Sequence, residues 1–243
     1  NPFSRRTKIS ADVDVISAEY MKVKYTDLKL WAKLDTGYVD AGIISMNPEA
    51  DFDMSVEGRL DQSEIFDLTF EGEVRTLDLH ALNLADSVMN GSFTMDGRAK
   101  VAPAKSIYDV DMTIATLDWN MPGVELSTPS IDIKLNANDS SLKASLVNES
   151  LTADLAAPCP LDSLTARLTN AMAILDHQIQ QKRIVVDSLQ RALPPFALDI
   201  RSGRQSIVAD YLAASKTSVN DYTLRLLNDS LISIQADAHG IAA

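Results

Sequence analysis

The sequence predicts a mainly β protein that carries one long amphipathic helix, and three observations lead to this fold class. Apolar and polar residues alternate in many segments, including 9–15 and 28–34, which is the period of a strand with one buried face. Residues 161–193 instead repeat their apolar side chains every three or four positions, as a helix does. Asn-Asp-Ser turns at 138–140 and 228–230 each separate two alternating segments, as in a β-hairpin. We therefore expect antiparallel sheets with the helix packed on their apolar, concave face.

The helical segment has an apolar stripe and clear ends. Asp162 or Ser163 is expected to cap its start, and the two prolines at 194–195 stop it. The polar run 178–183 interrupts the stripe, so a break into two helices near residue 180 is an open alternative. We expect the stripe to act as a lid on the strands, hinged at 178–183. The lid residues are Leu164, Leu168, Leu175 and Ile179.

Three alternating segments share a local pattern in which an acidic residue, a glycine and a charged residue stand between apolar positions: SVEGRL, TFEGEV and TMDGRA. Their glycines, Gly58, Gly72 and Gly97, fall in the inward phase of each strand. A glycine there leaves space for a bulge, a bend or a close neighbour. Gly37 and Gly42 are expected to loosen the turn after residue 34.

The inward side chains of the strands are mostly aliphatic, and their role has two interpretations. Sheets of this kind either close into a filled barrel, in which these residues are core, or stay open as a long apolar groove that could conduct lipid. The residues expected to line such a groove are Phe52, Met54, Val56, Phe66, Leu68, Phe70, Phe93, Met95, Val110, Met112, Ile114, Ile131, Ile133 and Leu135. A soft boundary near 158–160 divides a β-rich repeat region, 1–157, from a region of helix, short helix and strands, 158–243.

Composition and motifs argue against several functions. The net charge of −12 disfavours nucleic acid and electrostatic docking on anionic lipid. A single cysteine, Cys159, rules out an internal disulfide. No nucleotide-binding, hydrolase or zinc motif occurs, and the three histidines stand apart. The carboxylates at 51, 53, 61, 109 and 111 fit the solvent face of strands better than a calcium site. We therefore expect no enzyme, no catalytic residue, no cofactor and no metal.

Two long stretches carry a resemblance to a known family: LDLHALNLADSVMNGSFTMDGRAKV and SIYDVDMTIATLDWNMPGVELSTPSIDIKLNANDSSLKASL. With the helical insert that ends in a Leu-Pro step, and the short RQSIVADYLAAS helix after the next strand, they resemble the TamB-like translocation and assembly module proteins of the AsmA-like superfamily. The opening NPFSRRTKISADVDV fits the strand-rich repeats of the same family. The resemblance covers most of the chain. It depends on the local sequence pattern and on the order of the helices and strands, not on a catalytic motif.

The resemblance implies a fold and a function. Such proteins are long, periplasmic and anchored in the inner membrane by an N-terminal helix. Their strands coil into a taco-shaped groove lined by aliphatic side chains, and they are implicated in outer-membrane protein assembly and phospholipid transport. The chain starts at Asn1 without Met or signal peptide, so we expect an internal segment of such a bridge. Its expected partners are phospholipid acyl chains and, through regions outside these residues, an outer-membrane assembly partner.

The alternative is a β-sandwich or barrel that binds a protein or a glycan at its surface. Clustered aromatic residues would favour a glycan, but the two tryptophans, Trp31 and Trp119, lie far apart in the sequence. Aliphatic inward faces on strand after strand favour the groove.

Overall fold

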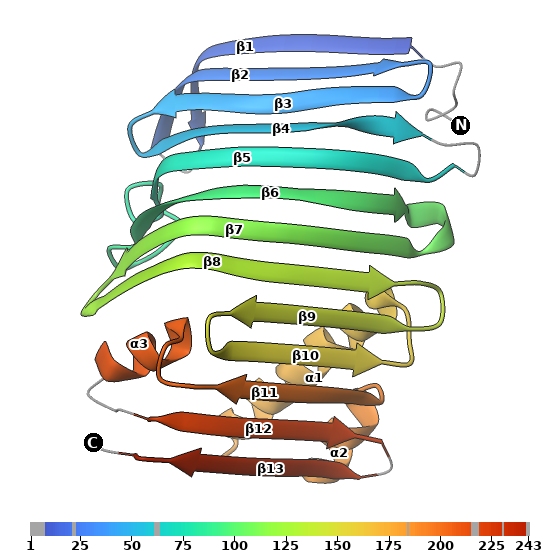
Figure 1. The fold of residues 1–243 in the computed structure, drawn as a ribbon, viewed down its shortest axis with the longest axis vertical. Coiled ribbons are helices and arrows are strands. Elements are labelled where there is room, and N and C mark those ends of the chain that lie inside the picture. Colours follow the sequence, from blue (N-terminus) through green and yellow to red (C-terminus); the bar gives the residue numbers. More distant parts are fainter. Residues whose placement is uncertain are drawn as a thin grey trace.

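The structure, a computed structural model, describes residues 8–20, 23–60, 64–183, 185–214, 219–229 and 231–241. It is one 13-stranded antiparallel sheet in which every strand pairs with its neighbours in sequence (Figure 1). Among the described residues, β1 and β13 each pair on one side only, so the sheet is open. The predicted mainly β fold with one long helix is confirmed, and the alternative of a sandwich or closed barrel is wrong.

The strands are long in the N-terminal part and short in the C-terminal part. They are β1 (Lys8–Tyr20), β2 (Val23–Asp35), β3 (Tyr38–Asn47), β4 (Ala50–Leu60), β5 (Phe66–Asp78), β6 (Asn90–Ala102), β7 (Ile107–Met121), β8 (Val124–Ala137), β9 (Leu142–Asn148), β10 (Leu151–Ala157), β11 (Phe196–Ser202), β12 (Asp221–Asn228) and β13 (Ile232–His239). The helices are α1 (Leu161–Gln180), α2 (Val186–Ala192), α3 (Ile207–Ala214) and the 3-10 turn η1 (Pro103–Lys105).

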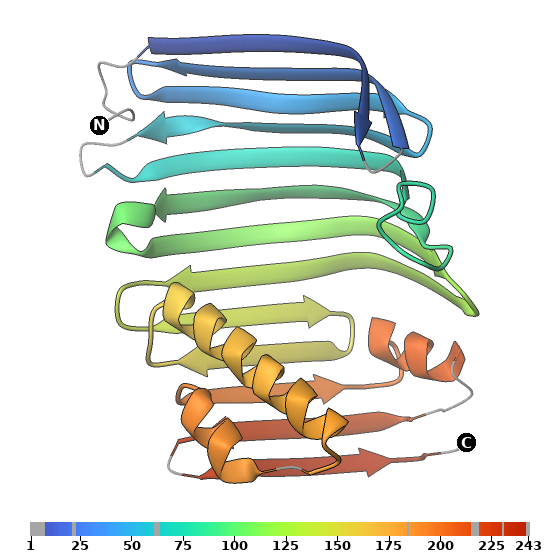
Figure 2. The ribbon, with the colours of Figure 1, turned by 180° about the vertical axis from the view of Figure 1, so that it is seen from behind.

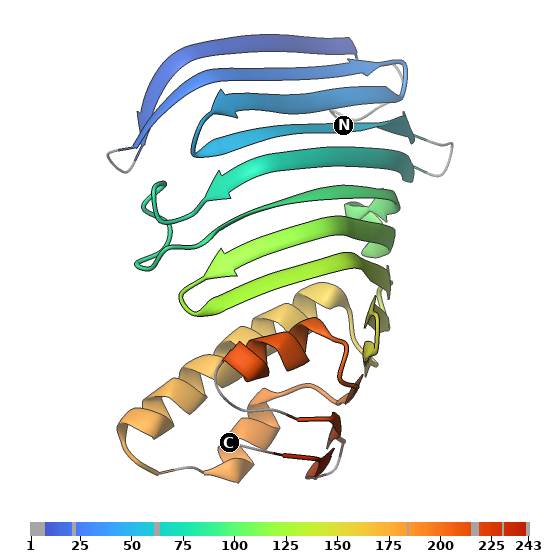
Figure 3. The same cartoon turned by 60° about the vertical axis from the view of Figure 1, so that its left-hand side comes forward.

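The long strands bend near one end, toward the face on which α1 lies (Figures 2 and 3). The bend coincides with β-bulges. Asp27 on β2 and Thr116 on β7 have positive φ, 56° and 50°, and the registers of β4 with β5 and of β6 with β7 each shift near the same end. Because a bulge adds one residue to a strand and increases its local bend, these positions give the sheet its curvature. They also switch the inward phase of β7 from Ile114 to Leu117.

The bent part of β8 extends past β9, which pairs only with residues 132–137 of β8. Helix α3 packs against β8, and Ser206, the residue before its first turn, accepts a hydrogen bond on Oγ from the backbone N–H of Ala209 at 3.1 Å. Asn148, which is buried, ties the two elements together. Its Nδ2 donates to the carbonyl of Ser130 at 2.7 Å and its Oδ1 accepts from the N–H of Ile207 at 3.2 Å. The helix therefore protects a strand edge that β9 leaves uncovered.

Helices α1 and α2 form a helical hairpin inserted between two strands that pair with each other. Ala156 on β10 pairs with Ala197 on β11, so the sheet runs without interruption across the boundary expected near 158–160. Of the two alternatives for residues 161–193, the structure has the break near residue 180: α1 ends at Gln180 and α2 begins at Val186. The expected cap is wrong, because the helix starts at Leu161 with Pro160 at the N-cap position and no side-chain cap, which leaves Asp162 inside the first turn.

The connection between α1 and α2 is fixed by Gln178. Its side chain is buried, its Nε2 donates to Ser188 Oγ at 2.6 Å, and its Oε1 accepts from the N–H of Val185 at 2.8 Å. The polar run 178–183, expected as a loose hinge, is thus anchored through its first residue.

Two apolar clusters hold the elements together. The larger joins α1 to the sheet, where Leu164 packs with Leu142, Phe196 and two alanines of β8 and β10. The smaller contains Val23, Ala50 and Leu82, which is 3% exposed. Leu82 belongs to the connection 79–89, which consists of turns.

Candidate functional site

The strand register lines up apolar side chains in continuous rows on one face of the sheet. The first row crosses all thirteen strands: Ile9, Leu34, Val39, Gly58, Leu68, Ala99, Val110, Leu135, Ala144, Leu155, Leu198, Leu226 and Ile234. The second also crosses all thirteen: Ala11, Ala32, Ala41, Val56, Phe70, Gly97, Met112, Ile133, Leu146, Ala153, Ile200, Leu224 and Ala236. A third crosses β1–β8: Val13, Leu30, Ile43, Met54, Gly72, Met95, Ile114 and Ile131. We call the face bearing these rows on β1–β8 the apolar trough.

The opposite face is polar in the same continuous way. The row that alternates with the first two contains Ser10, Lys33, Asp40, Glu57, Thr69, Arg98, Asp111, Lys134, Ser145, Asp154, Asp199, Arg225 and Gln235. A hollow of about 660 Å³ on this side is lined mainly by charged and hydroxyl groups, among them Glu71 and Asp96. The two faces of the sheet therefore differ sharply in their affinity for water.

All fourteen residues expected to line a groove lie on the apolar face. Eleven belong to the three rows, and Phe52, Phe66 and Phe93 continue the same phase on β4, β5 and β6. Ile131 is buried and the others are half-buried. Half-burial means that each side chain is packed by its neighbours in the sheet and still presents one side to whatever lies above it.

A hollow of about 530 Å³ lies in the trough, and much of its lining comes from strands outside the expected set. Val13, Leu30 and Ile43 line it together with Met54, Val56 and Phe70. The alternation in β1 and β2 identified those strands from the sequence, so Val13 and Leu30 could have been included. The sequence does not indicate strand β3, because Gly42 and Ile44 break its alternation of apolar and polar residues.

The four expected lid residues do not share one environment. Leu164 is 4% exposed and Leu168 packs against the same cluster, whereas Leu175 is 37% and Ile179 58% exposed. Helix α1 therefore crosses the C-terminal strands obliquely (Figure 2), and Leu164 and Leu168 pack in a cluster against which the first row lies at Leu135, Ala144, Leu155, Leu198 and Leu226. The C-terminal half is held by α2 through Gln178 and leaves Met172, Leu175 and Ile179 exposed.

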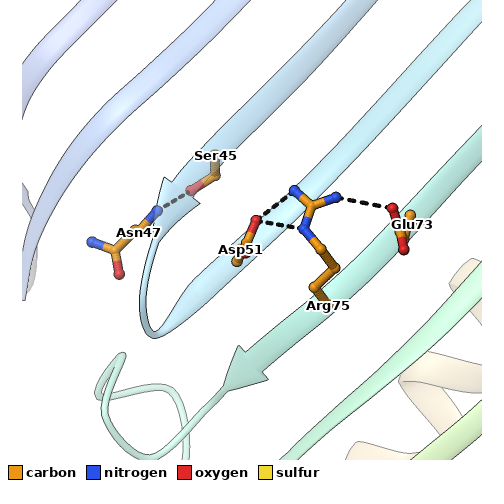
Figure 4. Close-up of polar contacts among 5 residues, drawn as sticks. All are labelled: Ser45, Asn47, Asp51, Glu73 and Arg75. Carbon is orange, nitrogen blue, oxygen red and sulfur yellow. Dashed lines mark hydrogen bonds and ion pairs between the residues drawn. The ribbon is translucent and has the colours of Figure 1, made fainter.

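Charged groups near the bend are paired on the polar face. Arg75 on β5 lies between Asp51 and Glu73, and its Nε donates to Asp51 Oδ1 at 2.9 Å (Figure 4). These hydrogen bonds hold the pKa of the Asp51 carboxyl below its ordinary value and raise the pKa of Arg75. At the end of β3, Ser45 Oγ accepts from the N–H of Asn47 at 3.3 Å. The Arg75–Asp51 contact ties β5 to β4 where the sheet bends, and the Ser45–Asn47 contact holds the end of β3.

Within the part of the chain that the structure describes, no group of three or more His, Cys, Asp or Glu side chains gathers in a metal-binding arrangement. Asp61, one of the carboxylates noted in the sequence, lies outside the described residues. None of the described helices combines the length and the apolar character that crossing a bilayer requires.

Comparison with known proteins adds no relative. No protein-family model, curated protein or solved structure matches the chain. The features of the chain that point to a function are therefore the two contrasting faces of the sheet.

Proposed function

We propose that the chain is a non-enzymatic, periplasmic segment of an envelope-spanning protein that serves outer-membrane protein assembly and phospholipid transport. The sheet would be a taco-shaped shield in which acyl chains lie against the apolar trough while headgroups stay in water. The anchor to the inner membrane and the contact with an outer-membrane assembly partner would lie in regions outside these residues, as in the TamB-like proteins that the sequence resembles.

The proposal depends on one observation: the three apolar rows run across β1–β8 without interruption. No ionisable side chain interrupts the three rows on β1–β8. At about 4.8 Å between strands, these eight strands give a trough about 34 Å long. Each methylene group moved from water onto such a surface gains about 0.8 kcal/mol, so a lipid tail would be bound strongly.

The chemistry of the trough favours a tail over an extended peptide. The backbone groups of the interior strands are used in the sheet, and the side chains of the three rows on β1–β8 are hydrocarbon and thioether. A peptide strand laid across them would bury N–H and C=O groups without partners, which is costly. An acyl chain has no such groups.

A second occupant, an amphipathic helix of a client protein, is favoured by one observation. Helix α1 of this chain already packs its apolar side on the same face over the C-terminal strands. A client helix would satisfy its own backbone, and it would serve the assembly function rather than lipid transport.

Native mass spectrometry of the purified chain tests the proposal. We expect adducts with the mass of a phospholipid. Leu30→Glu places a charge in the trough at a position already 36% exposed, so the fold should survive. If the charged side chain removes the contact of the trough with two methylene groups of the lipid tail, the affinity for phospholipid should fall about tenfold. Thr69→Glu makes the same charge change on the polar face and should leave the adduct unchanged. A parent without phospholipid, or equal loss in both variants, would contradict the proposal.

A further inference from the structure

The floor of the apolar trough is not level, because its second row changes from small to large side chains between β3 and β4. Ala11, Ala32 and Ala41 lie directly opposite one another on β1, β2 and β3. They line the hollow of about 530 Å³ together with Val56 and Phe70, which continue the row on β4 and β5. We call this space the β1–β5 hollow, and the three alanines its floor.

Larger side chains stand on both sides of the floor. On the same three strands, the third row forms one wall, which lines the hollow: Val13, Leu30 and Ile43. The first row stands on the other side of the alanines: Ile9, Leu34 and Val39. The floor and these two rows make a furrow that crosses the strands and therefore runs along the trough.

The side chains that face the hollow are hydrocarbon and thioether. Trp31 and Ser55 also line it, but each alternates with residues of the rows, so its side chain points to the polar face. On that face Trp31 Nε1 donates a hydrogen bond to Asp40 Oδ1 at 3.0 Å. The hollow thus matches an occupant that carries neither charge nor hydrogen-bonding groups.

The width of the furrow suits one hydrocarbon chain. On one strand the first and third rows are four residues apart, as Leu34 and Leu30 are on β2. At about 3.4 Å per residue their backbones lie about 14 Å apart, and the branched side chains narrow this gap. Carbon atoms in contact are about 3.5–4.0 Å apart, so one chain needs about 8 Å between the walls and two chains side by side need about 12 Å.

We propose that the β1–β5 hollow seats a single acyl chain of the bound phospholipid, which lies over Ala11, Ala32 and Ala41 and crosses the strands. This inference rests on the proposed function. Farther along the second row, Met112 and Ile133 stand up from the floor, so a tail there touches the protein on one side. In the hollow a tail is contacted by the floor and both walls, and burial of more apolar surface gives tighter binding.

Filling the floor tests the seat. Ala32→Leu changes an exposed position flanked by two alanines, so the fold should be kept. The whole chain is incubated with vesicles of phosphatidylethanolamine and phosphatidylglycerol, and native mass spectrometry measures the fraction that carries phospholipid. We expect this fraction to fall several-fold, although the substitution makes the trough more apolar. Ala11→Leu, at another exposed floor position, should have the same effect.

The matched control is Ala236→Leu, which makes the same change at an exposed alanine of the second row on β13, outside the hollow. It should bind phospholipid like the parent. If the parent binds phospholipid and both floor variants bind it equally well or better, the seat is overturned and the proposed function stands. An equal loss in Ala236→Leu would also overturn the seat. A parent that binds no phospholipid would remove the proposed function, and the seat with it.

Discussion

The ring of Phe70 on β5 lies over the bare backbone of Gly97, its direct partner on β6. A Cβ at Gly97 would stand 2.5 Å from Phe70 Cζ and 2.6 Å from the carbonyl oxygen of Asp111 on β7. Gly58 lies opposite Leu68 in the same way. The inward glycines thus make room for the large side chains that lie flat on the trough floor.

Gly97→Ala should therefore destabilise the protein. The added methyl meets a ring and a backbone oxygen, and overpacking of this kind costs about 1–3 kcal/mol. Gly72→Ala is the matched control, because its methyl would lie 3.1 Å from Met95 Cε and 3.2 Å from Met54 Cγ, which are flexible. It should stay within about 1 kcal/mol of the parent. Urea midpoints of the three proteins compare the two sites, and equal losses would show that the Phe70 contact is not limiting.

The two faces of β5 should respond differently to charge. Phe70→Asp puts an unpaired carboxylate among the apolar rows and should lower the free energy of unfolding by more than about 2 kcal/mol. Glu71, on the other face, lies opposite Asp96. Glu71→Lys replaces this like-charge pair by an opposite one and should change stability by less than about 0.5 kcal/mol, in the favourable direction. Denaturant titration of both variants measures the contrast, and similar losses would mean that the strand phase is wrong.

Much of the sheet could be predicted because its signals are local. Alternation in β1, β2, β4, β5 and β8, and the turn at Asn138, whose Oδ1 accepts from the N–H groups of Ser140 and Ser141 at 2.9 Å, depend on neighbouring residues only. Strand β3 was missed because Gly42 looked like a turn residue. In the structure Gly42 is mid-strand and faces the ring of Trp31, its partner on β2. The reason for a glycine at this position becomes visible only when β2 and β3 are paired.

The sequence predicts which side chains lie on the apolar face of the sheet, but not how far along the sheet that face stays uncovered. Which residues point inward follows from a period of two, whereas which of them are covered depends on where α1 crosses the sheet. Leu164 and Ile179 sit on one sequence stripe and differ in exposure, 4% against 58%. The difference arises because Gln178 turns the chain into α2, a buried polar contact that periodicity does not reveal.

That difference gives a stability prediction for the helix. Leu164→Ala removes a buried side chain from the cluster that joins α1 to the sheet and should cost about 2–5 kcal/mol. Ile179→Ala, at an exposed position of the same helix, should cost less than about 0.5 kcal/mol. Thermal and urea unfolding provide the two values. A large loss at Ile179 would mean that the C-terminal half of α1 packs against something in solution.

The Arg75–Asp51 pair should contribute stability only above acidic pH. Arg75 lowers the pKa of Asp51 from its ordinary value of 3.8, so the folded state binds that proton less readily than the unfolded state. The contribution is fully present above pH 3.8 and is lost as the pH falls through the lowered pKa. Arg75→Gln should therefore lose a little stability at neutral pH and match the parent more closely at low pH. Urea titrations at both pH values measure this, and a gap that widens on acidification would contradict it.

The edges of the open sheet lead to a prediction of self-association. Among the described residues β1 and β13 each have one unpaired side, and the first apolar row reaches both, at Ile9 and Ile234. A two-fold axis perpendicular to the sheet would pair β1 with β1 of a second copy in antiparallel fashion and keep both apolar faces on the same side. Unpaired N–H and C=O groups on long strands promote such contacts. Light scattering should therefore show a mean mass that rises with concentration.

Lysine at the edges should stop this association, since charged side chains on an edge strand oppose pairing. Ile9→Lys with Ile234→Lys alters positions that are 52% and 66% exposed, so the fold should be unaffected and the protein should remain monomeric. Met46→Lys, on the interior strand β3 and 68% exposed, controls for the loss of surface hydrophobicity and should associate like the parent. If Met46→Lys abolishes association as well, the association arises from nonspecific hydrophobic contacts and not from pairing of the edge strands. If the parent is monomeric at every concentration, the edge strands do not pair between copies.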